Sequence, residues 1–470
     1  MHRSTAPSTG ITRRSLLAGS AAAAALSATR LGRANATPRF PAVPAGRAEA
    51  LANAWGVNVH YDFQQSEYGD EQRVTDLLID LGVRHVRNRY KPGVAAIRDS
   101  FQQLADNGCR VNAICGVADS STQPTMAELM EGIVADFGPD AALVFSALEG
   151  VNEPNNDDIP WVIRTRSMQA ELWRARSARQ ETSSIPVIGP ALARKVGGMD
   201  KYGMTNDERT RLDYEALGDL TAYCTRGNIH VYPDDSSPSD EIDKFMGWAS
   251  AVYGDLRITC TEGGYWNHLG ADGVSNVIPN YTGGAHAVPE DVAALYSPRH
   301  LCEHFLRGNR LNTYQLLDQT KNADSDRGGH FGLVRSDYTL KPAFNAMRRF
   351  LDLVGDRSPR TFARTSFRPA GLRHAVAGGT ADYRSLLLQR STGEHLLVMW
   401  RDVKLYDYDV DKHAGRYLQV NPYAVTVTLD ESAPVTVYRP STTAGPAASW
   451  GSARSFDVPL SGGIVVAEIG

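Results

Sequence analysis

The sequence predicts an α/β fold in which a closed (β/α)8 TIM barrel precedes a C-terminal β-sandwich domain. Up to about residue 355, short apolar runs typical of strands buried on both faces alternate with amphipathic helical patterns. Beyond that point helical patterns stop and strand-like runs separated by Gly, Pro and Ser take over. We therefore predict a signal peptide over 1–36, a lead-in over 37–51, the barrel over 52–355 and the sandwich over 356–470.

Eight predicted strands and eight predicted helices alternate through the barrel region. The strands are Ala54–His60, Val83–Arg87, Arg110–Gly116, Leu143–Val151, Ile185–Gly189, Asn228–Tyr232, Arg257–Glu262 and Asn312–Leu317. The helices are Glu71–Leu81, Ala95–Asn107, Thr125–Phe137, Trp161–Arg179, Asp207–Leu217, Asp240–Tyr253, Ala293–Arg307 and Pro342–Leu353. A doubly wound open sheet is the alternative, but no GxGxxG motif follows the first predicted strand to support it.

The C-terminal region contains only strand patterns. The predicted strands are Ser385–Arg390, His395–Arg401, Ala424–Leu429, Val435–Tyr438, Ser455–Leu460 and Ile464–Ile469. Near the other end of the chain, Val43–Leu51 is expected to add an N-terminal strand or strap.

The first 36 residues have the features of an export signal. Arg13 and Arg14 directly precede an apolar run, Leu16 to Leu26, that is too short to span a bilayer. Ala34-Asn35-Ala36 is a plausible cleavage site. An ordinary secretory signal or an uncleaved anchor is the alternative. We predict a secreted or extracytoplasmic protein exported by the twin-arginine pathway, with no membrane association after the signal is removed.

Charge and cysteine content exclude several classes of protein. Removing the five Arg of residues 1–36 from 49 basic residues leaves 44 against 53 acidic ones, a net charge of −9. Such a chain gains nothing from binding a phosphate backbone, so we expect no nucleic-acid partner. The five cysteines are scattered without CxxC or metal-ligand spacing, and we expect them to be buried, with one disulfide possible. No metal and no cofactor are predicted.

Two glutamates stand at the carboxyl ends of predicted barrel strands, where catalytic groups of such barrels lie. Glu153 follows the fourth strand in Asn152-Glu153-Pro154, and Glu262 closes the seventh. Strands three apart can bring two carboxyls face to face across the barrel mouth. Glycosidic cleavage needs this arrangement, because one carboxyl protonates the leaving oxygen while the other attacks the anomeric carbon or activates water.

The combination of Asn152-Glu153-Pro154 with a lone Glu262 ending strand seven resembles the clan A glycoside hydrolases, family 39 most and family 5 next. The resemblance covers about residues 52–355. It implies that Glu153 is the acid/base, that Glu262 is the nucleophile, and that the anomeric configuration is retained. A later sequence, Lys341-Pro342-Ala343-Phe344, resembles the entry into the eighth helix of that clan.

The resemblance also implies roles for neighbouring residues. Asn152 would bind the sugar 2-hydroxyl. The His-x-Tyr of strand six would place His230 and Tyr232 on one face as further sugar contacts, with the Tyr232 hydroxyl at Glu262. Arg87, at the end of strand two, would support the nucleophile, with Arg84 and Arg89 as alternatives.

Further candidate substrate contacts are distributed around the mouth. They are His60 at the end of strand one, Trp266 (with Tyr265) as a stacking platform in the long loop after Glu262, and Gln315 or Asp318 at strand eight, where many clan members have a Trp. For Trp266 and Tyr265 the alternative is that they pack the loop itself.

We therefore predict an exported retaining glycoside hydrolase that cleaves O-glycosidic bonds of an oligo- or polysaccharide by double displacement. The alternative is a non-catalytic carbohydrate-binding protein on a degenerate barrel. Either way the predicted partner is a carbohydrate; the sugar, its linkage and the oligomeric state do not follow from these motifs.

Overall fold

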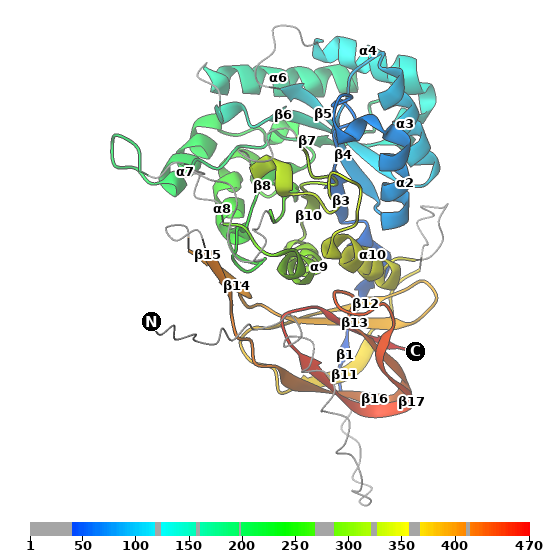
Figure 1. Cartoon of the computed structure of the whole chain (residues 1–470). Coiled ribbons are helices and arrows are strands. Elements are labelled where there is room, and N and C mark those ends of the chain that lie inside the picture. Colours follow the sequence, from blue (N-terminus) through cyan, green and yellow to red (C-terminus); the bar gives the residue numbers. More distant parts are fainter. Residues whose placement is uncertain are drawn as a thin grey trace, which may run out of the picture. The chain divides into compact units, whose positions relative to one another are not determined.

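The structure is a computed structural model, and its described residues form one compact unit within Phe40–Gly470 (Figure 1). The described residues are 40–117, 124–156, 160–196, 199–267, 286–320, 327–356, 367–409 and 414–470. The predicted signal over 1–36 and most of the loop after Glu262 (268–285) lie outside them.

Eight parallel strands form the first sheet, which confirms the predicted (β/α)8 architecture. They are β3 (Trp55–Asn58), β4 (His85–Arg89), β5 (Arg110–Val117), β6 (Phe145–Asn152), β7 (Val187–Ile188), β8 (Gly227–His230), β9 (Ile258–Gly263) and β10 (Arg310–Thr313). The sheet order runs β7-β6-β5-β4-β3-β10-β9-β8. A parallel bridge between Ile188 and Arg226 joins the two ends of this order and closes the barrel.

Helices alternate with these strands, and most lie close to the predicted ranges. The α-helices of the barrel region are α1 (Ala48–Ala52), α2 (Glu71–Leu81), α3 (Ala95–Asp106), α4 (Met126–Phe137), α5 (Ala141–Val144), α6 (Trp161–Ser177), α7 (Asn206–Leu217), α8 (Ile242–Tyr253), α9 (Glu290–Leu306) and α10 (Pro342–Val354). Short 3-10 turns cover Glu67–Gly69, Gly138–Asp140, Pro154–Asn156, Thr221–Tyr223 and Arg327–His330. None of the described helices is both long and apolar enough to cross a membrane.

Local chemistry explains several helix bounds. The Asp70 side chain accepts a hydrogen bond from the backbone N–H of Arg73 at the start of α2, and Gly82 ends that helix at φ 72°. A capping box of Thr125 and Glu128 begins α4. Pro342 lies in the first turn of α10, where its missing N–H costs nothing.

The C-terminal region forms a second, antiparallel sheet, as predicted for its fold class. Its strands are β11 (Leu372–Ala377), β12 (Tyr383–Gln389), β13 (His395–Arg401), β16 (Tyr423–Tyr438), β17 (Pro446–Leu460) and β18 (Val465–Ile469). A separate hairpin consists of β14 (Tyr406–Asp409) and β15 (Ala414–Tyr417). The prediction of separate strands at 424–429 and 435–438 is wrong, because β16 runs through both ranges as one strand that pairs with β17, with register shifts between Thr428 and Val435.

The lead-in residues add two short strands to this second sheet. β1 (Ala42–Val43) pairs with β11, and β2 (Gly46–Arg47) pairs with β12. The chain then passes through α1 directly into the first barrel strand. A strap from the start of the described chain therefore joins both sheets.

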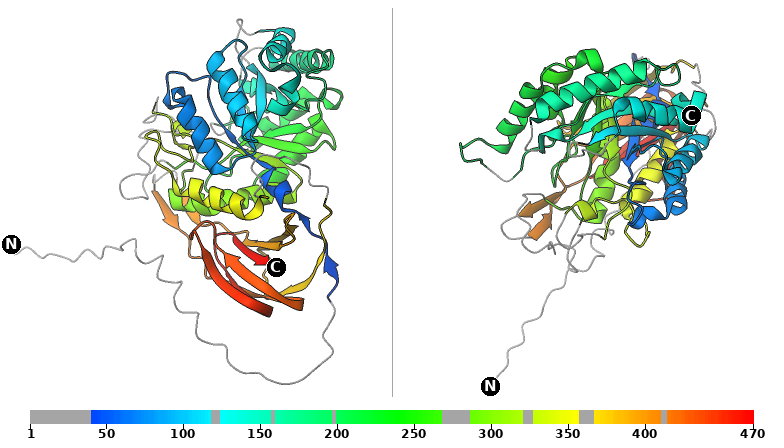
Figure 2. Two further views of the ribbon diagram at one scale, coloured as in Figure 1. Left: turned by 90° about the vertical axis from the view of Figure 1, so that its right-hand side faces the viewer. Right: turned by 90° about the horizontal axis from the view of Figure 1, so that it is seen from above.

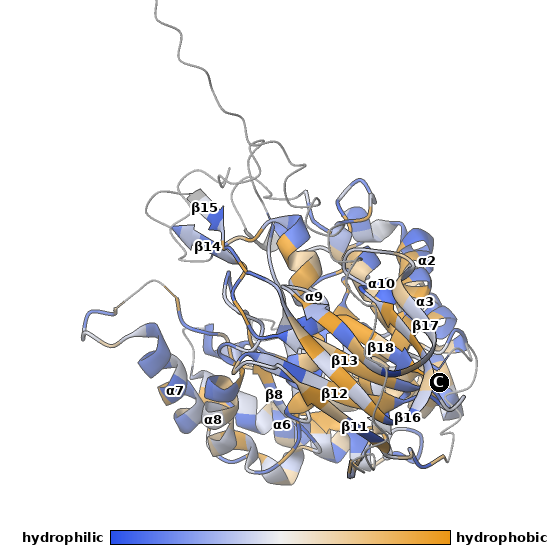
Figure 3. Cartoon of the chain, turned by 90° about the horizontal axis from the view of Figure 1, so that it is seen from below, coloured by the Kyte–Doolittle hydropathy of each residue, from blue (hydrophilic) through white to orange (hydrophobic). Residues whose placement is uncertain are grey.

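The two sides of the C-terminal sheet face different cores. Leu397 and Met399 of β13 belong to an apolar core formed by residues of the C-terminal sheet alone. Trp400, on the other face of β13, belongs to the core shared with the barrel. Trp400 donates from its ring nitrogen to Glu303 Oε1 of α9 at 2.7 Å. The orange and red strands lie against the barrel helices in Figure 2, and apolar residues concentrate along β12, β13 and β18 in Figure 3.

All five cysteines are free and buried. The expectation of small buried side chains is confirmed, and the possible disulfide is not formed. Burial raises the pKa of the Cys109 and Cys115 thiols to about 12, which keeps them protonated and unreactive.

Candidate active site

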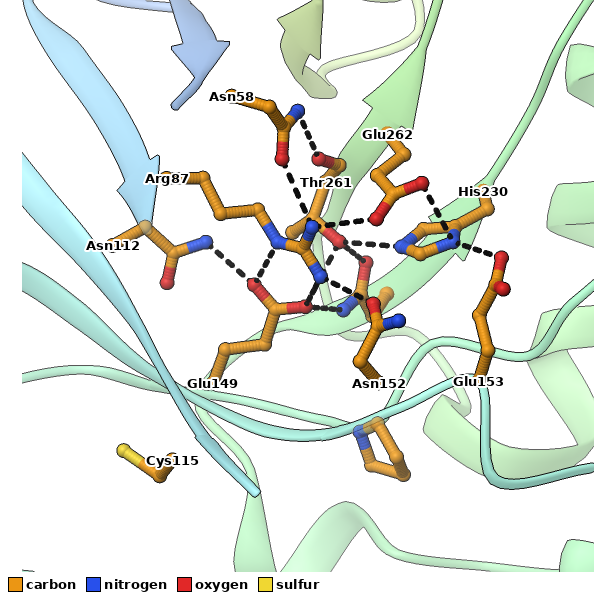
Figure 4. Close-up of polar contacts among 12 residues, drawn as sticks. Asn58, Arg87, Asn112, Cys115, Glu149, Asn152, Glu153, His230, Thr261 and Glu262 are labelled. Carbon is orange, nitrogen blue, oxygen red and sulfur yellow. Dashed lines mark hydrogen bonds and ion pairs between the residues drawn. The ribbon is translucent and has the colours of Figure 1, made fainter. Parts of the chain in front are cut away.

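A buried ion pair forms the floor of the site inside the barrel (Figure 4). Arg87 of β4 donates from Nε and Nη2 to the two oxygens of Glu149 of β6 at 2.8 and 2.7 Å. Asn112 Nδ2 (2.7 Å), Asn228 Nδ2 (3.1 Å) and the Thr261 hydroxyl (3.1 Å) also donate to Glu149. Every oxygen of this fully buried carboxylate is therefore satisfied, which its burial requires.

Arg87 also reaches the two strand ends that the sequence singled out. Its Nη1 donates to Glu262 Oε1 at 2.6 Å and to Asn58 Oδ1 at 2.9 Å, and its Nη2 donates to Asn152 Oδ1 at 2.6 Å. At 2% exposure, Arg87 positions the groups around it and offers little surface to a substrate. The alternative Arg84 pairs instead with Glu49, at 2.8 Å.

Glu262 lies near the end of β9 with both carboxylate oxygens held. Arg87 binds Oε1, and the Tyr232 hydroxyl donates to Oε2 at 2.6 Å. Burial alone would raise the pKa of Glu262, but the charge of His230, then that of Arg87, and the hydrogen bond from Tyr232 outweigh burial and hold it well below its usual range. The site therefore presents Glu262 as an ionised carboxylate.

Glu153 lies one residue beyond β6 in a backbone conformation that few non-glycine residues adopt, with φ 45°. Such a conformation costs about 1–3 kcal/mol and persists only where neighbours enforce it. Its backbone N–H donates to Ala191 O at 2.9 Å, and its carbonyl accepts from Asn156 N at 3.2 Å. The Glu153 side chain is 27% exposed against 12% for Glu262, so Glu153 is the more open carboxyl.

His230, at the end of β8, lies between the two carboxyls (Figure 4). Its Nδ1 is 2.8 Å from Glu153 Oε1 and 3.6 Å from Glu262 Oε2, while its Nε2 is 3.0 Å from Thr261 Oγ1. Because the ring is 2% exposed and both nitrogens have protein partners, the prediction of His230 as a sugar contact is wrong. Its place is between the two glutamates.

Glu153, His230 and Glu262 each contribute one atom to a group whose members lie within 4.8 Å of one another. Among the described residues no other set of three acidic, histidine or cysteine side chains is gathered this closely. The ring nitrogens of His230 and the carboxyl oxygens of Glu262 have protein hydrogen-bond partners. That the protein uses no metal cofactor remains a prediction.

The end of strand eight differs from the prediction. Gln315 is fully buried, and its Oε1 accepts from Gln319 Nε2 at 3.0 Å and from the Tyr68 hydroxyl at 3.4 Å. Asp318 pairs with Lys341 at 2.8 Å. Both side chains therefore have protein partners, and Gln315 is fully buried, so the expectation that it faces the substrate is not met.

At the end of strand eight, Tyr314 rather than Gln315 lies beside the site. Its ring lies edge-on to His60 at 5.8 Å and to Tyr232 at 6.3 Å between centroids. The half-buried ring of His60 stacks on Phe63 at 4.6 Å. These rings form an aromatic side of the site next to Glu262. The sequence signal for Tyr314 was its position directly after β10, where the resemblance calls for an aromatic residue.

Trp266 is not an open stacking platform. It is 1% exposed and packs with Ala287 and Phe331, with Tyr232 and Tyr314 against the same cluster. A hydrogen bond from Val288 N to Trp266 O, 3.0 Å long, joins the described residues on the two sides of this loop. The platform prediction is therefore wrong, because Trp266 is buried in this cluster, where it supports the rings of Tyr232 and Tyr314.

A cavity of about 750 Å³ opens beside the carboxyl ends of β4 and β5. Arg89, Lys91 and Ile114 line it together with the first turn of α4. Neither Glu153 nor Glu262 lines this cavity.

Glu149 and its polar partners were missed by the sequence analysis. A carboxylate in the middle of a strand that is otherwise uncharged, Phe145–Asn152, was a usable signal, because a buried acid requires a buried partner. What the sequence did not contain was the pairing itself, since Arg87 lies 62 positions away and two strands over.

Sequence comparisons give no match to a family model or to a curated protein. Solved structures, however, share the fold over most of the chain. A family 39 glycoside hydrolase from Bacteroides cellulosilyticus WH2 superposes with a TM-score of 0.54 at 13% identity, covering 91% of this chain and 83% of that one.

Two further structures give similar values. The GH39 enzyme from Xanthomonas axonopodis pv. citri has a TM-score of 0.53 at 12% identity, with coverage of 91% and 95%. A monomeric β-xylosidase from Caulobacter crescentus CB15 has a TM-score of 0.53 at 13% identity, with coverage of 92% and 97%. The chain is thus structurally similar to family 39 glycoside hydrolases, including the region beyond the barrel.

Proposed function

We propose that this protein is a retaining glycoside hydrolase, with Glu153 as acid/base and Glu262 as nucleophile. The observation that carries the proposal is the closeness of the two carboxyls, because one oxygen of Glu153 lies within 4.8 Å of one oxygen of Glu262. Retaining enzymes hold their carboxyls about 5–5.5 Å apart, whereas inverting ones need about 6.5–9.5 Å to admit a water between them.

The environments of the two glutamates support distinct roles. Arg87 and Tyr232 hold Glu262 as an ionised carboxylate with fixed orientation, which suits a nucleophile. Glu153 is more exposed and stands on an enforced turn, so it can reach the oxygen of a leaving group.

Double displacement then takes two steps. A Glu262 oxygen attacks the anomeric carbon while the glycosidic C–O bond breaks, and the proton of Glu153 goes to the leaving oxygen. Glu153 next removes a proton from water, the water oxygen attacks the same carbon, and the bond to Glu262 breaks. Each carboxyl ends in its starting protonation state, and the anomeric configuration is retained.

Substrate contacts follow from the groups left open around this pair. Because Asn152 Oδ1 accepts from Arg87, its Nδ2 is the atom that can donate to a sugar hydroxyl. Tyr314 and His60 provide ring surface on the Glu262 side of the site. The proposed substrate is an O-glycosidic bond of an oligo- or polysaccharide.

We also propose export by the twin-arginine pathway. The support is Arg13-Arg14 before the apolar run, together with five cysteines that need no oxidation for folding. Such a protein can fold before export. Replacing both Arg with Lys should leave the protein in the cytoplasm, and continued export would refute this route.

Trapping with 2-fluoro glycosides tests the mechanism. A panel of 2-fluoro aryl glycosides should yield one covalent adduct, located on Glu262 by peptide mass spectrometry, and Glu262→Gln should form none. Failure of every sugar, with binding of oligosaccharides retained, would indicate the carbohydrate-binding alternative. Wild-type turnover by Glu262→Gln would overturn the nucleophile assignment.

A further inference from the structure

The hydroxyl of Thr261 decides which nitrogen of His230 carries a proton. Thr261 Oγ1 lies 2.8 Å from Asn228 Oδ1, 3.1 Å from Glu149 Oε1 and 3.0 Å from His230 Nε2. A hydroxyl has one proton to donate and two lone pairs to accept with. Two of its three neighbours, the amide oxygen and the carboxylate oxygen, only accept.

The orientation of the Asn228 amide follows from its other contacts. Its Nδ2 donates to Glu149 Oε1 at 3.1 Å and to Gly189 O at 3.0 Å, both of which are acceptors. The Asn228 oxygen therefore faces Thr261, and the Thr261 hydroxyl donates its one proton to Asn228 Oδ1 or to Glu149 Oε1. No proton remains for His230 Nε2, so Nε2 carries its own and donates to Thr261 Oγ1.

With Nε2 protonated, Nδ1 is the nitrogen of His230 that gains or loses a proton. It lies 2.8 Å from Glu153 Oε1 and 3.6 Å from Glu262 Oε2. We propose, resting on the proposed function, that His230 is a positioning residue that stays cationic through the reaction and places one Nδ1–H between both carboxyls. It thereby compensates whichever of the two is charged.

The negative charge of the site changes place during double displacement, and His230 is close to both places. In the free enzyme the charge is on Glu262, and Glu153 carries the proton that the leaving group will take. When Glu262 becomes a neutral ester and Glu153 has lost its proton, the charge is on Glu153. Water then returns a proton to Glu153 as the ester breaks. The His230 protons are not consumed in either step.

The charges around His230 favour its cationic form. Glu153 and Glu262 face it from β6 and β9, Arg87 lies beyond Glu262 on β4, and Arg87 is itself paired with Glu149. Burial lowers the pKa of His230, but the charge of Glu262 and the hydrogen bond to Glu153 outweigh burial and raise it. Arg87 is shared between Glu149 and Glu262, whereas His230 is the cation that lies next to both Glu153 and Glu262.

Histidine NMR measures this state without relying on activity. The protein is labelled with ¹⁵N-histidine, and His230 is identified among the 12 histidines by comparison with His230→Asn. The side chain of free histidine has a pKa of about 6.5. Both ring nitrogens of His230 should still be protonated above that pH. They should also remain protonated in the enzyme trapped on Glu262. A neutral His230 ring at pH ~6.5, in the free enzyme or in the trapped one, would overturn the proposal.

Thr261 variants test the proton assignment. Thr261→Ser keeps the hydroxyl and should leave the His230 nitrogen shifts unchanged. Thr261→Val removes the acceptor of Nε2 and should lower the pH at which His230 loses its proton. Equal spectra for the two variants would contradict the role of the Thr261 hydroxyl.

The pH profile separates a charge effect from a purely structural one. His230→Asn places a neutral amide donor near the Nδ1 position, and His230→Ala removes the donor as well. Both should move the acid limb of kcat/KM upward by about 1–3 pH units, because Glu262 loses an adjacent cation. A lower rate with an unmoved acid limb would mean that His230 only fills space. If no glycoside is hydrolysed or trapped, the proposed function fails, while the NMR experiment on the free protein still decides the state of His230.

Discussion

The barrel and the C-terminal sheet bury side chains of opposite character on their inner faces. The barrel interior holds Arg87 and Glu149 in a polar layer linked by hydrogen bonds. The interior of the C-terminal sheet is apolar, with Leu397, Val427 and Phe456 in its core. A polar interior adds little net stability but fixes charged groups in place, whereas an apolar interior stabilises without positioning any reactive group. The difference assigns chemistry to the first region and stability to the second.

The largest effect expected in the barrel is on activity. Glu153→Ala should slow hydrolysis of glycosides with poor leaving groups by about 10²–10⁴-fold, because general acid catalysis is lost. Aryl glycosides with excellent leaving groups should be largely spared in the first step. Rates measured across a leaving-group series check this, and equal losses throughout would contradict the acid/base role.

Breaking the ion pair beneath the site should cost stability as well as activity. Glu149→Gln removes the carboxylate that accepts two hydrogen bonds from Arg87 and leaves Glu262 as the one carboxylate still paired with it, and we expect a loss of about 3–5 kcal/mol in the free energy of unfolding. Denaturant unfolding measures it. The double variant Arg87→Met with Glu149→Leu should recover much of that stability but remain inactive, because Glu262 then lacks its partner. A stable, fully active double variant would show that the polar barrel interior is not needed to position the catalytic groups.

A cavity in the C-terminal sheet should affect stability alone. Leu397→Ala should lower the free energy of unfolding by about 2–5 kcal/mol through lost burial and an unfilled cavity. Below the unfolding transition kcat/KM should be unchanged, because Leu397 lies in the core that faces away from the barrel. A fall in kcat/KM at full folding would show that the two regions are coupled.

The pH dependence should reflect the environment of Glu262. Its pKa in the folded protein is depressed below the unfolded value of about 4.3. Its contribution to stability is therefore present above that unfolded value and is lost as the pH falls through the folded pKa. We expect the acid limb of kcat/KM to lie below pH ~4. An acid limb well above that value would show that Glu262 is not held as described.

The smallest effect is expected at the surface of the C-terminal sheet. Trp450 is 36% exposed on β17. Trp450→Ala should change the free energy of unfolding by less than about 1 kcal/mol and leave kcat/KM unchanged. Weaker binding to polysaccharide with unchanged hydrolysis of aryl glycosides would instead give this sheet a role in carbohydrate binding.

The sequence by itself determined the parts that depend on local periodicity and on strand ends. The helix Glu71–Leu81 and the strand His395–Arg401 have the predicted bounds. Glu153 and Glu262 lie together because carboxyl ends of parallel strands share one end of a barrel. These features follow from spacing along the chain, which sequence alone contains.

Only the tertiary structure decided which neighbouring side chains face the site. Trp266 and Gln315 sit at positions where a strand or loop meets the mouth, yet both are buried by segments distant in sequence. The pairing of Arg87 with Glu149 and the placement of His230 between two carboxyls depend on register across several strands. Register is set by the closed barrel as a whole, so the groups that shape the chemistry of Glu153 and Glu262 emerge only when it closes.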